Sequence, residues 1–126
     1  MAVRALNARG QLTEAGWQAQ VIGIARVGGW CVYHPPDNRP GGRTGRPQRT
    51  IPEATGWPDL VLVRDGELLV RELKTDRGRL GPGQQDWLDR LAACGVDVAV
   101  WRPRDRADVE ARLLAPRNTT TTRSAD

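Results

Sequence analysis

Asp59, Glu72 and Lys74 are the residues whose types and spacing suit chemistry at a phosphate group. Two carboxylates repel each other, and placing both at one buried spot costs stability unless a cation compensates them. Mg²⁺ takes one or two carboxylates together with water and phosphate oxygens. Such an ion lowers the pKa of a bound water and neutralises charge that develops on phosphorus. Lys74 is the single lysine among nineteen basic residues, and a compact ammonium can orient an attacking water.

The segment that carries these residues reads as a β-hairpin. Residues 60–64 and 67–71 are strand-like runs, and Asp65-Gly66 between them supplies the positive φ angles of a type I′ turn. Both runs carry apolar residues on both faces, so we expect them inside a sheet that is covered on each side.

The turn fixes which residues lie opposite each other. A two-residue turn pairs Arg64 with Glu67, and five further steps bring Asp59 opposite Glu72. The Cβ atoms of such a pair lie roughly 4.5–5.5 Å apart. Strand alternation places Lys74 on the same face as Glu72. A β-bulge next to the turn would shift this register, and the competing interpretation is an exposed Glu72–Lys74 ion pair in a spacing that matches by chance.

The remaining pattern predicts an α/β fold. We expect a helix over residues 12–26 with Thr13 as its cap, a strand over 30–33 and a long loop over 35–57. A second helix opens at Gly81-Pro82-Gly83, a strand follows at 96–101, and a last helix spans 103–114. The helix between two strands implies a parallel pair and the hairpin an antiparallel one, so the sheet is mixed and flanked by helices.

The whole chain fits one soluble domain. Its 126 residues are enough for one modest core, which we place at 12–114, between a flexible segment at 1–11 and a disordered tail at 115–126. No apolar run approaches the roughly 18 residues of a membrane span, and we expect a cytoplasmic protein with no membrane contact. The net charge of +4 favours a polyanionic partner.

Two short motifs resemble a known family. Gly56-Trp57-Pro58-Asp59 followed by Glu72-Leu73-Lys74 resembles the Pro-Asp…(Asp/Glu)-x-Lys signature of the PD-(D/E)XK, restriction-endonuclease-like nucleases. More specifically, the chain is similar to the virus-type replication-repair nuclease (VRR-NUC) domain in its standalone phage and bacterial form. The likeness runs from about Thr13 to Arg104 and includes Gln18, residues 29–35, residues 78–80, Gln84, Trp87-Leu88 and residues 100–103. It departs at Gly81 and Gly83, where Ser or Thr and Glu are commoner, and we expect a weaker start of the second helix there.

The resemblance implies an αβββαβ core and Mg²⁺- or Mn²⁺-dependent cleavage of DNA. Asp59 and Glu72 would hold the metal with the Leu73 carbonyl, Lys74 would serve the nucleophilic water, and Glu14 would join from the first helix. It further implies a likeness to Holliday-junction resolvases, which can act as homodimers on branched DNA.

Several other residues have both a functional and a plain structural interpretation. Glu14 is also a first-turn acid that the helix dipole favours. Gln84 could hold Lys74 or a phosphate oxygen, or simply cap its helix or face solvent. His34 reads as a polar residue at a strand end. Two groups of arginines could bind DNA phosphates or simply belong to solvated loops. The first lies in the long loop and the second after the hairpin: Arg39, Arg43, Arg46 and Arg49, and Arg77 and Arg79.

Three hypotheses on function follow. The first is a metal-dependent endonuclease that hydrolyses DNA and is selective for its structure. The second is a non-catalytic DNA-binding module, and the third is a nuclease-like subunit that needs a partner. Two acids on the binding face repel phosphate in the absence of a metal, so binding alone gives no reason for them, and the endonuclease is favoured.

Overall fold

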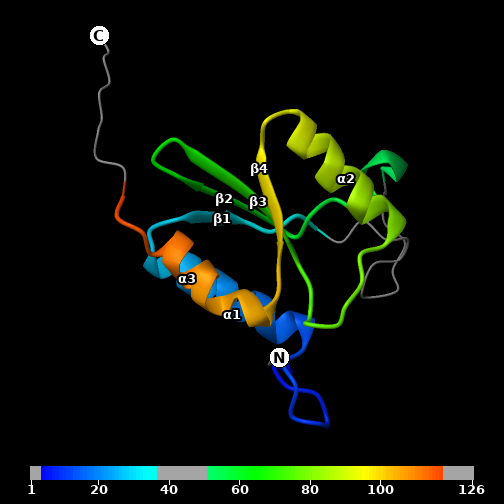
Figure 1. Ribbon diagram of the computed structural model, residues 1–126, viewed down its shortest axis with the longest axis vertical. Coiled ribbons are helices and arrows are strands. Elements are labelled where there is room, and N and C mark those ends of the chain that lie inside the picture. Colours follow the sequence, from blue (N-terminus) through cyan, green and yellow to red (C-terminus); the bar gives the residue numbers. More distant parts are fainter. Residues whose placement is uncertain (1–3, 37–50, 118–126) are drawn as a thin grey trace.

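A four-stranded mixed sheet of order β1-β2-β3-β4 forms the centre of the molecule (Figure 1). The first two pairs of neighbouring strands are antiparallel and the last pair is parallel. The strands are β1 (Cys31–Tyr33), β2 (Leu60–Arg64), β3 (Glu67–Leu73) and β4 (Asp97–Trp101). This computed structural model describes residues 4–36 and 51–117.

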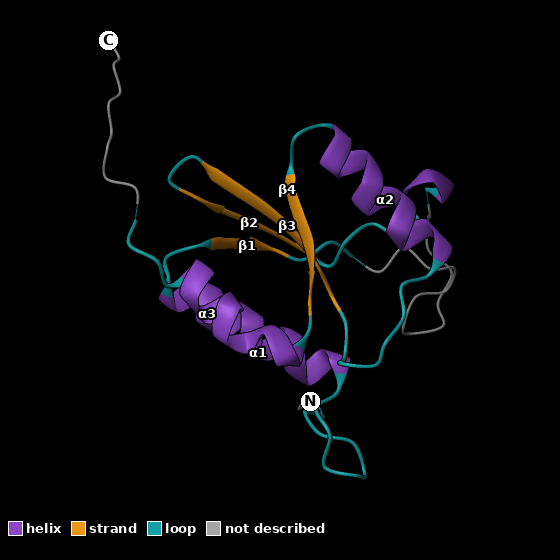
Figure 2. Cartoon of the chain, in the orientation of Figure 1, coloured by secondary structure: helices purple, strands orange, loops and turns teal. Residues whose placement is uncertain are grey.

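Helices lie on both sides of the sheet, which confirms the predicted α/β class (Figure 2). They are α1 (Glu14–Val27), α2 (Pro82–Ala93) and α3 (Arg106–Leu113), with short 3-10 turns η1 (Pro52–Ala54) and η2 (Pro103–Asp105). α1 and α3 cover one face, whereas α2 lies across the other near β4. The sequence predicted one helix over 103–114; the structure splits it because the Asp105 carboxylate accepts a hydrogen bond from the Arg102 N–H and closes a tighter first turn.

The hairpin forms as the sequence predicts. Asp65 and Gly66 have φ values of 48° and 80°, the positive angles that a type I′ turn requires. Arg64 pairs with Glu67, and the ladder continues without a bulge to Leu60 opposite Arg71. β2 and β3 are therefore the two inner strands of the sheet.

The two faces of the hairpin are buried to different extents. The face toward α1 and α3 forms the main core, which contains Trp17, Val21, Ala25, Trp30, Leu60, Leu62, Leu69, Leu73, Trp101, Val109 and Leu113. On the opposite face Val70 is buried, but Val63 and Leu68 near the turn are each 45% exposed. Full cover on both sides was expected and is wrong here: among the described elements, α2 contacts β4 rather than the turn end of the hairpin.

The segments at the two ends of the domain are held by specific contacts. Residues 4–13, partly in the predicted flexible segment, form a small hydrogen-bonded turn with a Leu6–Leu12 bridge. In the predicted tail, Arg117 makes two hydrogen bonds to the Asp65 carboxylate. No helix in the described parts of the chain has the length and apolar character to cross a membrane.

Candidate active site

Asp59 and Glu72 lie next to each other at the open end of the hairpin. The ladder ends at Leu60 and Arg71, so these two acids are the next pair in the register that the sequence predicted. The Asp59 Oδ2 atom accepts a hydrogen bond of 2.7 Å from the Leu73 N–H, which ties the aspartate to the end of β3. The alternation along β3 places Glu72 on the α2 side, opposite the core residue Leu73.

Glu72 is almost completely buried, at 1% exposure. Its Oε2 atom accepts a 2.9 Å hydrogen bond from the Gln84 Nε2 and lies 3.6 Å from the Lys74 Nζ. Its Oε1 atom is buried and has no hydrogen-bond partner among the described residues. A buried, unpartnered carboxylate oxygen is costly in a protein interior, so the site is built to receive a further positive or proton-donating group.

The surroundings of Glu72 raise its pKa to about 8. Burial is the largest cause because it disfavours the charged form. The Asp59 charge acts in the same direction, both through space and as an acceptor for a protonated Glu72, and Glu14 adds to it. Lys74 opposes the shift. Without a metal, Glu72 therefore keeps a proton, and a bound cation could replace that proton.

Lys74 lies where β3 ends and joins three parts of the fold. Its backbone N–H donates to the Trp101 carbonyl on β4. Its side chain is 12% exposed and reaches Glu72, and its Nζ atom is 4.0 Å from the Glu14 Oε1 on α1. Four residues that the sequence predicted for the site therefore lie close together: Glu14, Asp59, Glu72 and Lys74.

Gln84 is oriented by the start of α2. Its Oε1 atom accepts a 2.8 Å hydrogen bond from the Gly81 N–H at the helix cap, so its amide NH₂ must face the other way, toward Glu72. The capping contact is one of the two interpretations that the sequence left open for Gln84. Gln84 touches Glu72 rather than Lys74 in the structure.

Gly83 allows α2 to approach the loop before Asp59 very closely. A Cβ atom at Gly83 would lie 2.9 Å from the Thr55 carbonyl oxygen, and one at Gly56 would lie 2.3 Å from the Gly83 carbonyl carbon. Gly56 also has a φ of 88°, which a side chain rarely permits. From the sequence we expected Gly83 to weaken the start of α2. In the structure it also lets the two backbones pack against each other, which a larger residue would prevent.

A residue that sequence reasoning set aside, His34, contacts the backbone of the site. Its Nδ1 lies 2.9 Å from the Asp59 carbonyl and its Nε2 lies 3.4 Å from the Gln18 Nε2 on α1. The carbonyl needs a donor and the amide NH₂ needs an acceptor, so the arrangement fits a neutral ring with its proton on Nδ1. The missing signal was the pairing of β1 with β2, which the sequence pattern did not show.

The predicted DNA-contacting arginines fall into two groups. Arg77 and Arg79 are exposed on the loop between β3 and α2, and Arg102 holds this loop through bonds of 2.6 Å to the Thr75 and Gly78 carbonyls. Arg43 and Arg46, like Arg39 and Arg49, lie outside the described residues.

The oxygen atoms at the site fit a hard divalent cation. Asp59 and Glu72 provide two carboxylates, and the Leu73 carbonyl points to the same strand edge as the N–H that binds Asp59. Within the described residues no three His, Cys, Asp or Glu side chains form a group that could by itself hold a metal. Mg²⁺ and Mn²⁺ need no such cage, because water and substrate phosphate complete their coordination.

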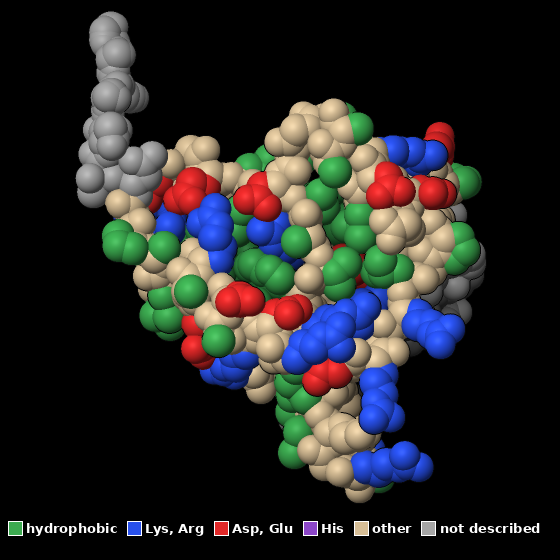
Figure 3. Space-filling model, viewed as in Figure 1, with side chains coloured by type: hydrophobic (Ala, Val, Ile, Leu, Met, Phe, Trp, Pro, Cys, Tyr) green, Lys and Arg blue, Asp and Glu red, His purple; other side chains and the backbone are tan. Residues whose placement is uncertain are grey.

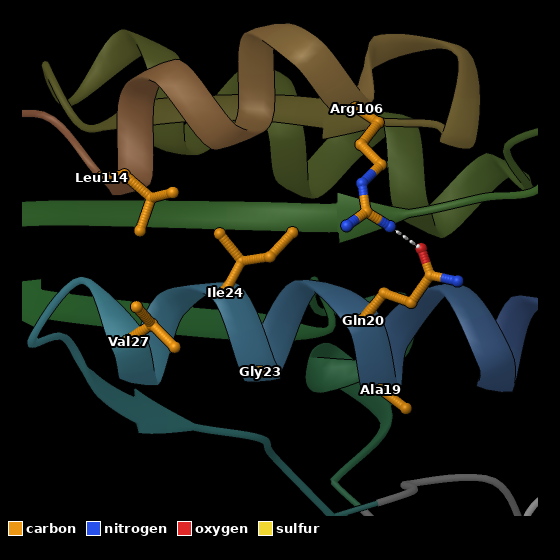
Figure 4. Close-up of a pocket in the computed structure, with 7 residues that line it drawn as sticks. All are labelled: Ala19, Gln20, Gly23, Ile24, Val27, Arg106 and Leu114. Carbon is orange, nitrogen blue, oxygen red and sulfur yellow. Dashed lines mark hydrogen bonds between the residues drawn. The ribbon is translucent and has the colours of Figure 1, made fainter.

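A groove lies away from the acidic site. This groove, between α1 and α3, is mainly apolar and shares no residue with the acidic site (Figure 4). It is lined by Ala19, Gln20, Gly23, Ile24, Val27, Arg106 and Leu114.

Comparison with known proteins gives one family. Residues 52–105 match the model of the VRR-NUC domain. The matched range contains Asp59, Glu72, Lys74 and Gln84, whereas Glu14 and His34 precede it. No curated protein and no solved structure matches the chain.

Proposed function

We propose that this chain, a VRR-NUC domain protein by the match of residues 52–105 and with a restriction-endonuclease-like α/β core, is a metal-dependent DNA endonuclease. The observation that carries the proposal is the pair of neighbouring acids Asp59 and Glu72, with Lys74 3.6 Å from the buried glutamate. A module that only binds DNA has no use for two acids that repel its ligand.

Asp59, Glu72 and the Leu73 carbonyl would hold Mg²⁺ or Mn²⁺, with Glu14 close enough to join through water. The bound ion would polarise the scissile phosphate and the attacking water. The unpartnered Glu72 Oε1 and the raised pKa of this residue support such a site, because a cation would replace the proton that Glu72 otherwise keeps.

The protein's own residues would orient the reaction. Lys74, held between Glu72 and Glu14, would hydrogen-bond the attacking water and the phosphate oxygen on which charge accumulates. Gln84 would keep the Glu72 carboxylate in place, since its amide is fixed by the α2 cap. Hydrolysis forms one P–O bond to water and breaks one P–O ester bond, and the proton lost by the water is returned to the leaving oxygen.

The substrate in this proposal is DNA, bound in part by the exposed Arg77 and Arg79 and by the loop arginines Arg43 and Arg46. Arginine contacts to phosphates give affinity that depends on salt and has little sequence preference. A branched substrate, a homodimer and a role in the bacterial or phage-infected cytoplasm complete the proposal on the strength of the family alone.

The test is incubation of the purified protein with supercoiled, linear, flap and four-way-junction DNA, in Mg²⁺, Mn²⁺ or EDTA. We expect nicking or cleavage with either metal and none in EDTA, and a fall of about 100-fold or more in Lys74→Ala, which equals roughly 3 kcal/mol of transition-state stabilisation. Activity that persists in EDTA, or an unchanged Lys74→Ala rate, would overturn the proposal. Equal rates on linear and four-way substrates would remove the branched-DNA part alone.

A further inference from the structure

The turn formed by residues 4–13 projects from the body of the molecule beside the first turn of α1 (Figures 1 and 2). Residues 4–11 are all exposed, and this stretch carries Arg4 and Arg9 with no acidic residue. Residues 4–11 thus expose two positive charges, and in the described turn Leu12 is the residue that packs against the core, a composition at the tip that suits a polyanion.

The turn is locally ordered by its own hydrogen bonds. The Asn7 Oδ1 accepts from the backbone N–H groups of Arg9 and Gln11, and the Asn7 Nδ2 donates to the Gln11 side chain. Gly10 at the tip has a φ of 76°, which the tight turn requires. Arg9 is therefore presented on an organised backbone, which reduces the entropy lost when it binds a ligand.

The base of the turn is fastened to α1. The Thr13 hydroxyl donates to the carbonyls of Arg4 and Ala5, while it caps the helix by accepting from the Gly16 N–H. A Cβ atom at Gly16 would lie 2.4 Å from the Ala5 carbonyl oxygen and 2.7 Å from its Cα. Glycine costs about 1 kcal/mol relative to alanine inside a helix, and here its lack of a side chain is what lets the turn dock.

This anchor places the turn beside the candidate active site. Thr13 is followed directly by Glu14, whose carboxylate lies 4.0 Å from the Lys74 Nζ. Arg9 lies four residues before Thr13, a separation that the chain can span over at most about 13 Å. In Figure 3 the Lys and Arg side chains run along the lower right of the visible face, down to the projecting segment.

Arg4 and Arg9 are also available for a partner. Their guanidinium groups make no hydrogen bond or ion pair with any residue in 4–36 or 51–117, as is true of Arg77 and Arg79. By contrast, seven other arginines in these ranges donate to carboxylates or carbonyls: Arg64, Arg71, Arg102, Arg104, Arg106, Arg112 and Arg117.

We propose that the 4–13 turn is a DNA-backbone clamp that binds phosphates a few nucleotides from the scissile one, through Arg4 and Arg9. This inference rests on the proposed function, because it names a second contact of the same substrate. It extends the DNA-binding surface from the β3–α2 loop to the segment that precedes α1.

The experiment measures binding without cleavage. Fluorescence anisotropy of a labelled DNA duplex in EDTA gives the dissociation constant at salt concentrations from about 50 to 200 mM. If both arginines contact phosphate, Arg4→Gln/Arg9→Gln lowers the log–log salt slope by about 1.8 and weakens binding up to about 60-fold at 0.1 M salt. The matched control is Arg26→Gln at the far end of α1, which leaves both values unchanged; this arginine is exposed, and its guanidinium makes no hydrogen bond or ion pair within residues 4–36 and 51–117.

A second pair of variants tests the anchor. Gly16→Ala pushes the Ala5 backbone away and should reproduce the loss of the double arginine variant, whereas Gly23→Ala on the same helix meets nothing within 4 Å and should bind as wild type. A wild-type salt slope in Arg4→Gln/Arg9→Gln, with Arg77→Gln/Arg79→Gln weakened, overturns the clamp and leaves the proposed function standing. Absence of DNA binding by the wild type in EDTA, together with absence of cleavage in Mg²⁺ and Mn²⁺, overturns both.

Discussion

The Glu72 carboxyl group is buried and lies next to a second carboxylate. Both facts raise the free energy of its ionised form. Gln84 and Lys74 offset part of that cost at Oε2, but Oε1 has no partner among the described residues. Such a group either keeps a proton or binds a cation. Its pKa of about 8 means that the metal-free protein holds the proton at neutral pH.

The stability of the metal-free protein should therefore fall as pH rises. Glu72 titrates near 4.5 in the unfolded chain and near 8 in the fold, so between these values the native state binds a proton that the unfolded state has lost. The free energy of unfolding then decreases with pH, by at most about 1.4 kcal/mol per unit. Urea denaturation in EDTA at several pH values between about 5 and 8, which lie within this interval, measures the decrease.

Glu72→Gln should remove most of this slope and raise the stability at the alkaline end. Glu110→Gln on α3, which loses only a surface ion pair with Arg106, is the control and should keep the wild-type slope. Parallel pH profiles for wild type and Glu72→Gln would contradict the assigned protonation of Glu72.

Some contacts of the site residues could be predicted from the sequence, and others could not. Asp59 and Glu72 could be paired because Asp65-Gly66 fixes a two-residue turn and hence the register. Glu14 was singled out by resemblance, and its proximity to Lys74 depends on how α1 packs on the sheet. His34 was missed because its contact with Asp59 requires β1 to lie beside β2, and three residues of strand carry too little pattern to show that.

At the scale of elements, α2 and the loop before Asp59 behave as one unit. Trp57 and Trp87 pack edge to face with ring centroids 4.9 Å apart, and the Trp87 indole donates to the Glu53 carbonyl. Gly56 and Gly83 bring the two backbones into contact beside them. This unit sets the position of Gln84 and the path of the backbone that leads to Asp59.

Gly83→Ala should disturb this unit and lower the cleavage rate. The new Cβ would lie 2.9 Å from the Thr55 carbonyl, so the start of α2 must shift and move Gln84 away from Glu72. Overpacking of this kind costs about 1–3 kcal/mol, partly offset by the gain of up to about 1 kcal/mol in helix propensity. Thermal unfolding and initial cleavage rates measure the two effects.

The control for this substitution is Gly23→Ala in α1, where nothing lies within 4 Å. It gains helix propensity without a clash and should be more stable than wild type by about 0.5–1 kcal/mol at an unchanged rate. A Gly83→Ala protein with wild-type rate and a similar gain in stability would show that the close contact does not position the site.

Element order and sheet type were readable from the sequence because periodicity, the Asp65-Gly66 turn and the helix caps agree with one another. Two element details were not. The division of the last helix depends on the local bond between Asp105 and the Arg102 backbone, and the exposure of Val63 and Leu68 depends on where α2 crosses the sheet. The first is a local polar contact and the second is a tertiary contact, and a hydrophobic pattern encodes neither.

For the whole molecule, the contacts of individual arginines indicate the binding surface better than the net charge of +4 does. Composition indicates a polyanionic partner but does not separate arginines that hold the fold from those that face solvent. Arg64 and Arg71 are buried and pack over Trp30 and Trp101. Arg4, Arg9, Arg77 and Arg79 are exposed and lack such contacts, and they are the arginines of the described chain to which we assign DNA.

The central claim is that Asp59 and Glu72 together hold a divalent cation for phosphodiester hydrolysis, and Asp59→Asn tests it most directly. An asparagine oxygen can still accept from the Leu73 N–H, so the fold is kept while one negative ligand is lost. Initial rates of Mg²⁺-dependent plasmid cleavage, measured beside the unfolding temperature, are predicted to fall about 100-fold or more with no loss of stability. A wild-type cleavage rate in folded Asp59→Asn protein would contradict the account.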